Sequence, residues 1–420
     1  MSSAALPNHA RTAIAVLALC LILNLIGRGV ADTYVVFLLP LENDLGWTRS
    51  QMTGVYAVYL MVNGLTAPLI GLLFDRVGPR LIYTLGLACL GVAYLLAARV
   101  ENMWQFYLTV GAMTGMAVSA LGMVPSSSLI ARWFRERLST ALSVAFAGLG
   151  LGALIIVPAT QALLQNIGWR ETYQVLGITL LALVLPLSLL PWRGIAAGRP
   201  DYRRERKTTV AGDADWTLRR AARTPTFWGL MWMFFMTSVG MFAVTVQTVA
   251  YLVDQGYAAL LAASAFGVAS MLSVFGIVLT GMLADRFGAR RVATSTYVGS
   301  GLGILVLLVI SWHPLPALLV VYVIVFGSCQ GARGPIISSM TTRLFAGPQV
   351  GLIYGVMYAA NAFGAGLGSV LAGVMHDATG NYRVGFVFSI MCLIAAALPL
   401  WRIPAMRDFR TRGGAGPAPG

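Results

Sequence analysis

Arg28 and Asp32 lie four residues apart inside the apolar sequence "NLIGRGVADTYVV" (residues 24–36). A charged side chain at the centre of a membrane helix costs about 2.5–3.5 kcal/mol on insertion scales, so such residues are candidates for function. An aspartate there can exchange protons, and an arginine can hold a carboxylate through two parallel hydrogen bonds. The pair therefore predicts either a proton-linked anion site or a self-neutralising structural ion pair.

Asn24, Arg28 and Asp32 follow an i, i+4, i+8 spacing, which places them on one stripe of a helix that must face the protein interior. Asp32 is the one carboxylate well inside an apolar segment. Burial disfavours its charge and Arg28 favours it, so a conformational change that alters either effect would move a proton. We therefore predict that Asp32 is a proton-coupling residue and that Arg28 contributes to substrate binding.

Arg333 is the other charge deep inside an apolar segment, within "CQGARGP" (residues 329–335). Gly331, Gly334 and Pro335 predict a loosened helix beside the guanidinium. Arg333 has no evident acidic partner in the sequence. Either it binds an anionic substrate, which is the hypothesis we favour, or backbone carbonyl groups satisfy it.

Polar and aromatic residues of other segments could line the same interior, although each alone is more often a packing or interfacial residue. From this larger set we predict three substrate-binding residues, Tyr59, Tyr358 and Asn361. The four cysteines share no metal-ligand spacing, and the sequence clusters no nucleophile with an acid and a base. We therefore expect no catalytic residues, no metal site and no cofactor.

The segments that carry these residues are those of an integral membrane protein. The 420 residues are 58% hydrophobic and only 10% charged, whereas soluble domains are about 25% charged. Apolar runs of about the 20 residues needed to cross a bilayer recur along the chain without β-type alternation. We predict an all-α protein with twelve spans near residues 12–41, 51–74, 81–99, 103–131, 139–165, 171–193, 225–254, 258–284, 292–312, 315–345, 348–375 and 383–404.

The basic residues are distributed unequally between the two faces of this arrangement. Of 29 Lys and Arg residues, two lie inside spans and only Arg49, Arg99, Arg170 and Arg383 fall in the odd-numbered loops. By the positive-inside rule both termini are cytoplasmic. The net charge of +14 is thereby explained by topology rather than by nucleic-acid binding. We divide the chain into a helical bundle (1–193), a basic cytosolic linker (194–224) and a second bundle (225–420).

Two decapeptides 210 residues apart show that the chain is an internal repeat. "GLLFDRVGPR" (71–80) and "GMLADRFGAR" (281–290) share Gly, Leu, Asp, Arg, Gly and Arg, and Gly46-Trp47 corresponds to Gly256-Tyr257. Parallel repeats of six helices related by an axis along the membrane normal are a transporter plan.

The two decapeptides resemble the signature loops of the major facilitator superfamily. "LGWTRS", "AGLGLGALIIVP", "GWRETY", "GARGP" and "HDATGNYR" are similar to its bacterial branch related to monocarboxylate and oxalate/formate carriers. The resemblance implies two pseudo-symmetric six-helix bundles in the inner membrane of a bacterium, a monomer, and alternating-access transport of a small organic anion, often with protons.

The resemblance also implies that the repeated loops are gates on the cytosolic side, with glycines that permit a tight turn. The residues concerned are Asp75, Arg76, Gly78, Arg80, Asp285, Arg286, Gly288 and Arg290. The sequence departs from this branch in having no arginine in span eight, no acidic-Gly signature in span one, and Asn361 near the position of a span-eleven lysine. The particular anion therefore does not follow from the resemblance.

Two other functions were weighed against organic-anion transport. A multidrug exporter would favour a Gly-Pro pair followed by Gly-Gly in span five, which "AGLGLGALIIVPAT" lacks. A transporter-like sensor should carry a signalling domain, and the linker and the tail "RDFRTRGGAGPAPG" resemble disordered segments instead. Efflux of drugs or metabolites remains the alternative and a sensor ranks below it.

Overall fold

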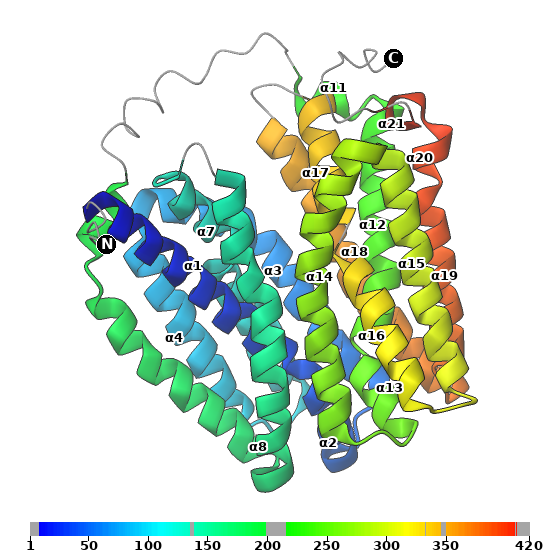
Figure 1. The fold of residues 1–420 in the computed structure, drawn as a ribbon. Helices are drawn as coiled ribbons and strands as arrows, with labels where there is room; N and C mark the ends of the chain where they lie inside the picture. Colours follow the sequence, from blue (N-terminus) through cyan, green and yellow to red (C-terminus); the bar gives the residue numbers. More distant parts are fainter. Residues whose placement is uncertain are drawn as a thin grey trace, which may run out of the picture.

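The computed structural model describes residues 8–134, 138–198, 216–331, 333–345, 350–407 and 409. Over these residues every regular element is a helix. Figure 1 shows two groups of helices side by side, one from the first half of the chain and one from the second half. Residues 199–215 of the predicted linker lie outside the described residues.

The first half runs from α1 to α9. Proline or a capping residue begins several of its helices; Thr48, for example, accepts from the Gln51 amide, and the Gln51 side chain accepts from Thr48 in return. Its elements are α1 (Asn8–Asp32), α2 (Tyr34–Leu45), α3 (Arg49–Val77), α4 (Pro79–Ala97), α5 (Met103–Phe106), the π-helix η1 (Tyr107–Met113), α6 (Thr114–Leu121), α7 (Met123–Ala131), α8 (Leu138–Leu189) and α9 (Trp192–Ala197).

The second half runs from α11 to α21 and repeats much of this order. Its elements are α11 (Leu218–Ala221), α12 (Pro225–Thr245), α13 (Thr248–Asp254), α14 (Ala259–Phe287), α15 (Ala289–Ile310), α16 (Pro316–Gln330), α17 (Arg333–Leu344), α18 (Val350–Thr379), α19 (Arg383–Ala397), α20 (Pro399–Arg402) and α21 (Pro404–Arg407).

Ten helical stretches of the described chain are long and apolar enough to cross a membrane. One of them combines two predicted spans, because α8 (Leu138–Leu189) contains 139–165 and most of 171–193, up to Leu189. Its two arms meet at Gly168, whose φ of 82° is not helical and suits glycine. The fifteen-residue α16 is apolar but shorter than the ten. The structure is thus a multi-pass helical membrane protein.

Several predicted spans are interrupted, including the one in which Gly331 predicts a loosened helix. The first span breaks at Thr33 between α1 and α2, and the seventh breaks between Thr245 and Thr248. Breaks at Gly122 and Gly331 have a residue that explains them, whereas the break at Thr33 has neither Gly nor Pro. Interrupted membrane helices are tolerated where other groups satisfy the backbone, commonly around binding sites.

The two halves meet at one end of the molecule, which we call the distal end and define by the turns at Gly46, Gly168, Gly256 and Gly380. The opposite, proximal end is where α1 begins at Asn8 (Figure 1). All four of these glycines have positive φ, which L-residues rarely adopt.

Helix α3 packs against α18 across the halves, from Thr53 beside Gly373 near the distal end to Gly64 beside Ala362 near the middle of α3. The Ser369 hydroxyl also donates to the Thr53 carbonyl oxygen at 2.9 Å. Helix α8 packs against α14, with Gly267 on the backbone of Ala153. The halves are therefore in close contact over the distal part of the molecule.

Glycines also bring α1 and α8 within backbone contact beside the predicted Arg28 site. A Cβ at Gly152 would lie 2.3 Å from the Leu25 carbonyl oxygen and 2.9 Å from the Gly29 Cα. Close packing through small residues is the usual way in which membrane helices associate, because lipid gives no hydrophobic drive between them. This contact fixes the position of α1, and with it the position of Arg28.

We expect Gly152→Ala to lower the thermal unfolding midpoint of the purified protein. The added methyl group must displace backbone, and overpacking of this kind costs about 1–3 kcal/mol. Gly301→Ala is the matched control, because a Cβ at Gly301 would meet nothing within 4 Å. Equal midpoints for the two variants would contradict the assigned α1–α8 contact.

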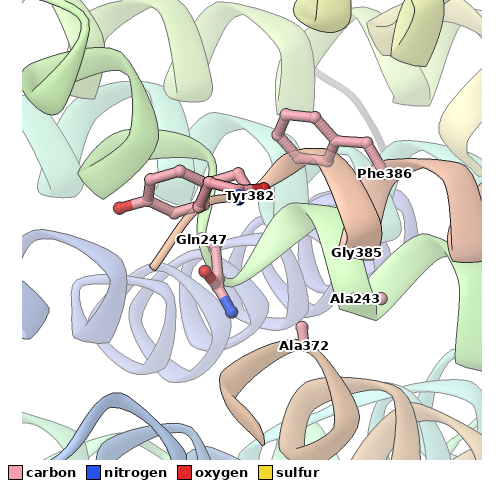
Figure 2. Close-up of a pocket in the computed structure, with 7 residues that line it drawn as sticks. Ala243, Gln247, Ala372, Tyr382, Gly385 and Phe386 are labelled. Carbon is pink, nitrogen blue, oxygen red and sulfur yellow. The ribbon is translucent and has the colours of Figure 1, made fainter. Parts of the chain in front are cut away.

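Two hollows lie next to each other near the distal end of the second half. The smaller one is lined by Gln247, Ala372 and Tyr382, among others, and is shown in Figure 2. The larger one, of about 410 Å³, is lined by Asp254, His376 and Tyr382, among others. Both hollows are lined by Asn381, Tyr382 and Phe386, so they adjoin along these residues.

Candidate functional site

The site is built around the end of α1, where the helix stops at Asp32. The Thr33 hydroxyl donates to the Val30 carbonyl oxygen at 2.6 Å, and the Tyr94 hydroxyl donates to the same oxygen at 2.7 Å. These bonds satisfy a carbonyl at the helix end, where intrahelical partners run out. The chain can therefore break beside a buried carboxylate without leaving that carbonyl unpaired.

Arg28 and Asp32 form the ion pair that their spacing predicts. Arg28 Nε lies 2.9 Å from Asp32 Oδ1 and donates to Oδ2 at 3.0 Å. The side chain of Asp32 is 7% exposed, whereas that of Arg28 is 33% exposed. The carboxylate is thus enclosed, while the Arg28 side chain is not.

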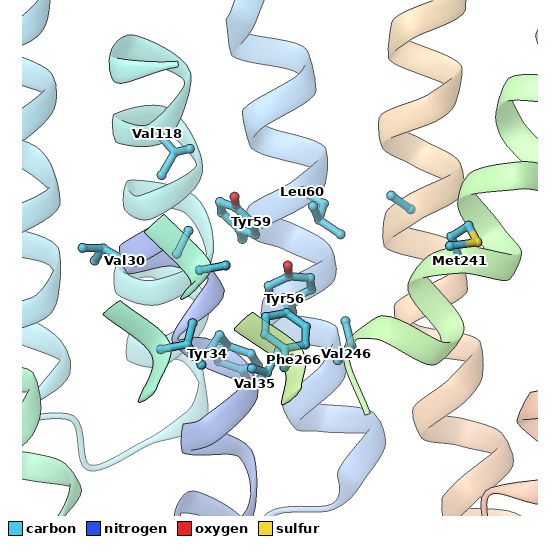
Figure 3. Close-up of a cluster of buried hydrophobic side chains, with 14 of the residues drawn as sticks. Val30, Tyr34, Val35, Tyr56, Tyr59, Leu60, Val118, Met241, Val246 and Phe266 are labelled. Carbon is cyan, nitrogen blue, oxygen red and sulfur yellow. The ribbon is translucent and has the colours of Figure 1, made fainter. Parts of the chain in front are cut away.

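Tyrosines of α3 cover this pair on the side of the first half. The Tyr56 hydroxyl donates to Asp32 Oδ1 at 3.5 Å, and the Tyr59 side chain interacts with Arg28. The rings of Tyr56 and Tyr59 lie 5.2 Å apart, and Tyr34 stacks on Tyr56 at 5.5 Å. Figure 3 shows the hydroxyl groups of Tyr56 and Tyr59 pointing the same way from one helix.

The second half contributes the other side of the cluster. The ring of Phe242 on α12 lies 6.5 Å from that of Tyr56, and the Arg28 charge acts on Tyr358 of α18. One helical turn from Tyr358, Asn361 Oδ1 accepts from the Ser238 hydroxyl at 2.5 Å. The structure therefore brings Arg28, Asp32, Tyr59 and Tyr358 together between the two halves, with Asn361 tied to α12.

Asn24, the third member of the predicted stripe, points into the first half. It is 1% exposed and its Nδ2 donates to the Cys20 carbonyl oxygen at 2.7 Å and to Ser126 Oγ at 3.0 Å. These contacts join α1 to α7. Asn24 thus fixes the rotation of α1 that turns Arg28 toward the second half.

The structure places Arg333 away from this cluster. Its Nη1 donates to the Thr296 carbonyl oxygen at 3.0 Å and to Ser300 Oγ at 2.9 Å, and Nη2 donates to the Gln330 carbonyl oxygen at 3.3 Å. The guanidinium also lies over the Tyr297 ring, 4.8 Å from its centroid. Arg333 is 2% exposed and held against α15 and the end of α16, so its role in binding substrate stays a prediction.

The predicted gating loops lie at the proximal end, between α3 and α4 and between α14 and α15. Gly78 and Gly288 have φ values of 87° and 89° and join these helices through tight turns. Arg76, Arg80 and Arg286 are exposed, and Arg290 lies over the Trp401 ring at 4.7 Å. The side chains of Asp75 and Asp285 lie outside what the structure describes, so the gating role remains a prediction.

The sequence patterns do not select two residues that the structure buries at contacts between helices, Tyr56 and Arg49. Tyr56 is one aromatic residue among many in the sequence. Its position four residues after Met52 and three before Tyr59 places these three side chains on a common helix face, which is the one signal for it. Arg49 was assigned to a loop, yet it is 3% exposed. No local sequence signal gives its partners Asp254, Asp377 and Tyr382, because they come from distant parts of the chain.

The comparisons with known proteins agree with this architecture. The family model described as "Major Facilitator Superfamily" matches residues 17–287 and 272–418. "Monocarboxylate transporter 13" of Rattus norvegicus is 27% identical over 90% of this chain and 85% of its own. "Uncharacterized MFS-type transporter YhjX" of Escherichia coli is 25% identical over 81% of this chain and 82% of its own.

A solved D-xylose-proton symporter has a similar fold, with a TM-score of 0.72 at 16% identity over 93% of this chain and 97% of the symporter. A bacterial homologue of the human lysosomal transporter Spinster, solved in an inward-facing and occupied conformation, gives a TM-score of 0.70 at 16% identity over 94% and 97% of the two chains. At these identities the likeness concerns the fold.

Proposed function

We propose that this chain, which belongs to the major facilitator superfamily, is a secondary active transporter for a small organic anion, namely a monocarboxylate or related carboxylic acid. The single observation that carries the proposal is Arg28. Its side chain is one third exposed, and its charge acts on tyrosines of both halves, Tyr59 and Tyr358. The relatives named monocarboxylate transporters support the same substrate class.

The geometry of Arg28 suits a carboxylate substrate. Asp32 engages Nε, so donors on the rest of the planar guanidinium remain for a second carboxylate. Tyr59 interacts with Arg28, the Arg28 charge acts on Tyr358, and these tyrosines would supply hydroxyl donors and apolar ring faces. A small apolar acid would thus place its carboxylate on Arg28 and its carbon chain against the rings.

Proton coupling is the second part of the proposal and assigns its role to Asp32. A substrate carboxylate on Arg28 competes with Asp32 for the same positive charge, which makes protonation of Asp32 easier. Tyr56 donates to the carboxylate and would stay in contact with either protonation state. Anion and proton would therefore bind together, and the protein would carry both across the membrane.

Alternating access requires the two halves to rock about the site, and the repeat supplies them. We propose twelve spans, counting the two arms of α8 separately and adding α16 with α17. Residues 1–193 and 225–420 would then be the two bundles and 194–224 their cytosolic linker. Both termini and the proximal end would face the cytoplasm of a bacterium, with the Asp75 and Asp285 loops as gates there. The protein would act as a monomer without catalytic residues or cofactor.

A ligand screen by thermal unfolding tests this function most directly. Purified protein is heated with a panel of monocarboxylic, dicarboxylic and amino acids, and with sugars and organic cations as controls. A ligand at 100 times its dissociation constant stabilises the native state by about 2.7 kcal/mol, which raises the unfolding midpoint clearly. We expect a monocarboxylate or close relative to do so. Stabilisation by cations alone would overturn the organic-anion proposal.

A further inference from the structure

Arg49 at the distal end makes contacts with both halves of the molecule. Its Nη2 lies 2.8 Å from Glu42 Oε2 on α2 of its own half and 3.9 Å from Asp254 Oδ2 on α13 of the second half. Its guanidinium also lies 5.8 Å from the centroid of the Tyr382 ring, and Tyr382 donates its hydroxyl to Asp254. One buried arginine thus joins a carboxylate of each half.

A second contact crosses the halves at the same point. Asp377, near the end of α18, accepts from the backbone amides of Arg49 at 3.1 Å and Ser50 at 2.8 Å. The first amides of a helix have no partner within it and carry a partial positive charge, so a carboxylate there stabilises the helix. The second half therefore caps α3 of the first half, and separating the halves at the distal end would remove this cap.

The internal repeat shows which of these contacts is special. At the offset of 210, Asp254 corresponds to Asp44, which stays within its own half and accepts from Trp169 Nε1 at 2.9 Å and from Arg170 Nη1 at 2.9 Å. Arg49 corresponds to Ala259, so the second half has no equivalent arginine. The bridging arginine is thus absent from one copy of the loop, and the loop fold does not require it.

Part of the Arg49 guanidinium also lacks hydrogen-bond partners. Its Nε and Nη1 are buried but find no hydrogen-bond partner among the described residues. Leaving such donors unpaired is costly, and opening the distal end would return them to water. The neighbouring hollow is lined by Asp254 and Tyr382, two residues of this contact, and Figure 2 shows Tyr382 beside buried Gln247.

We propose that Arg49 is a positioning residue of the transport cycle, the pin of a distal gate formed with Glu42, Asp254, Asp377 and Tyr382. It holds the distal end closed while the proximal end opens, and it releases Asp254 and Asp377 when the distal end opens. The gate lies apart from the Arg28 cluster and rests on the proposed function only in requiring an alternating-access cycle.

Hydrogen exchange of the full-length chain, followed by mass spectrometry without any substrate, tests the gate. Arg49→Ala and Asp254→Asn should speed exchange in distal peptides around residues 42–53 and 376–383. We expect a change of about fivefold or more, because fivefold corresponds to the lower limit of ordinary coupling free energies. They should slow exchange in proximal peptides around 76–82 and 286–292. Opposite changes at the two ends indicate a shift between states, whereas a merely structural role would speed exchange at both.

Asp44→Asn is the matched control, since it removes the repeat-related carboxylate whose described partners lie within one half. In this variant the proximal peptides should exchange as they do in the wild type. Arg49→Lys keeps the charge and should give a smaller shift than Arg49→Ala. If Arg49→Ala does not fold, Asp254→Asn and Asp377→Asn decide the question. Unchanged exchange, or faster exchange at both ends, in these variants would overturn the gate.

The two proposals fail independently in this design. Opposite exchange shifts in a protein that binds no carboxylate would leave the gate standing and refute the anion function. If the protein binds a carboxylate but its Arg49→Ala and Asp254→Asn variants show no exchange shift, the anion function would stand and the gate would be refuted.

Discussion

Arg28→Ala is expected to weaken binding of the carboxylate substrate by roughly 10- to 150-fold, the range of one lost charge-assisted hydrogen bond. The substitution removes the accessible guanidinium and also leaves Asp32 without its partner. Arg28→Lys keeps a positive charge but loses the planar fork, so we expect an intermediate loss. Isothermal titration or thermal-shift titration with the ligand found in the screen would measure both.

The same pair of substitutions at Arg333 gives the comparison that locates the anion. Arg333 donates to Thr296, Ser300 and Gln330, so its terminal nitrogens are occupied, whereas Arg28 is one third exposed. We therefore expect Arg333→Lys to weaken binding less than Arg28→Lys and to lower the unfolding midpoint more. An equal or larger loss of affinity at Arg333 would move the anion site to α17.

The central pair was predictable from the sequence because its geometry is local. An i, i+4 spacing on one helix brings Arg28 and Asp32 together whatever the rest of the chain does. The doubled decapeptide likewise predicted the turns at Gly78 and Gly288, both of which have positive φ. In each case, a short stretch of chain determines the outcome without reference to distant residues.

What the sequence did not predict depends on contacts between distant segments. The sequence alone places Arg49 in an outer loop. In the structure it is buried because Asp254, Asp377 and Tyr382 of the second half lie against it. The break at Thr33 is stabilised by Tyr94, sixty-one residues away, and neither Gly nor Pro marks it. The sequence and the structure both place Arg333 deep in an apolar segment, but only the structure shows that it contacts α15.

Asp32→Asn is the substitution expected to have the largest effect on transport, since it should abolish accumulation driven by a pH gradient. An amide has nearly the shape of the carboxylate and can still bond to Tyr56 and Arg28, but it cannot release a proton. Exchange of one substrate molecule for another does not require deprotonation. Counterflow should therefore persist in part while uptake against a gradient is lost.

Reconstituted vesicles separate the two activities, with uptake measured under an imposed pH gradient and counterflow measured in vesicles preloaded with unlabelled substrate. Asp44→Asn is the control, because it makes the same chemical change at a carboxylate held by Trp169 and Arg170 near the distal end. It should retain both activities. If Asp32→Asn still accumulates substrate fully, Asp32 does not carry the proton. The Arg28–Asp32 pair would then serve only to hold α1 in place, and a different positively charged group between the halves would have to bind the anion.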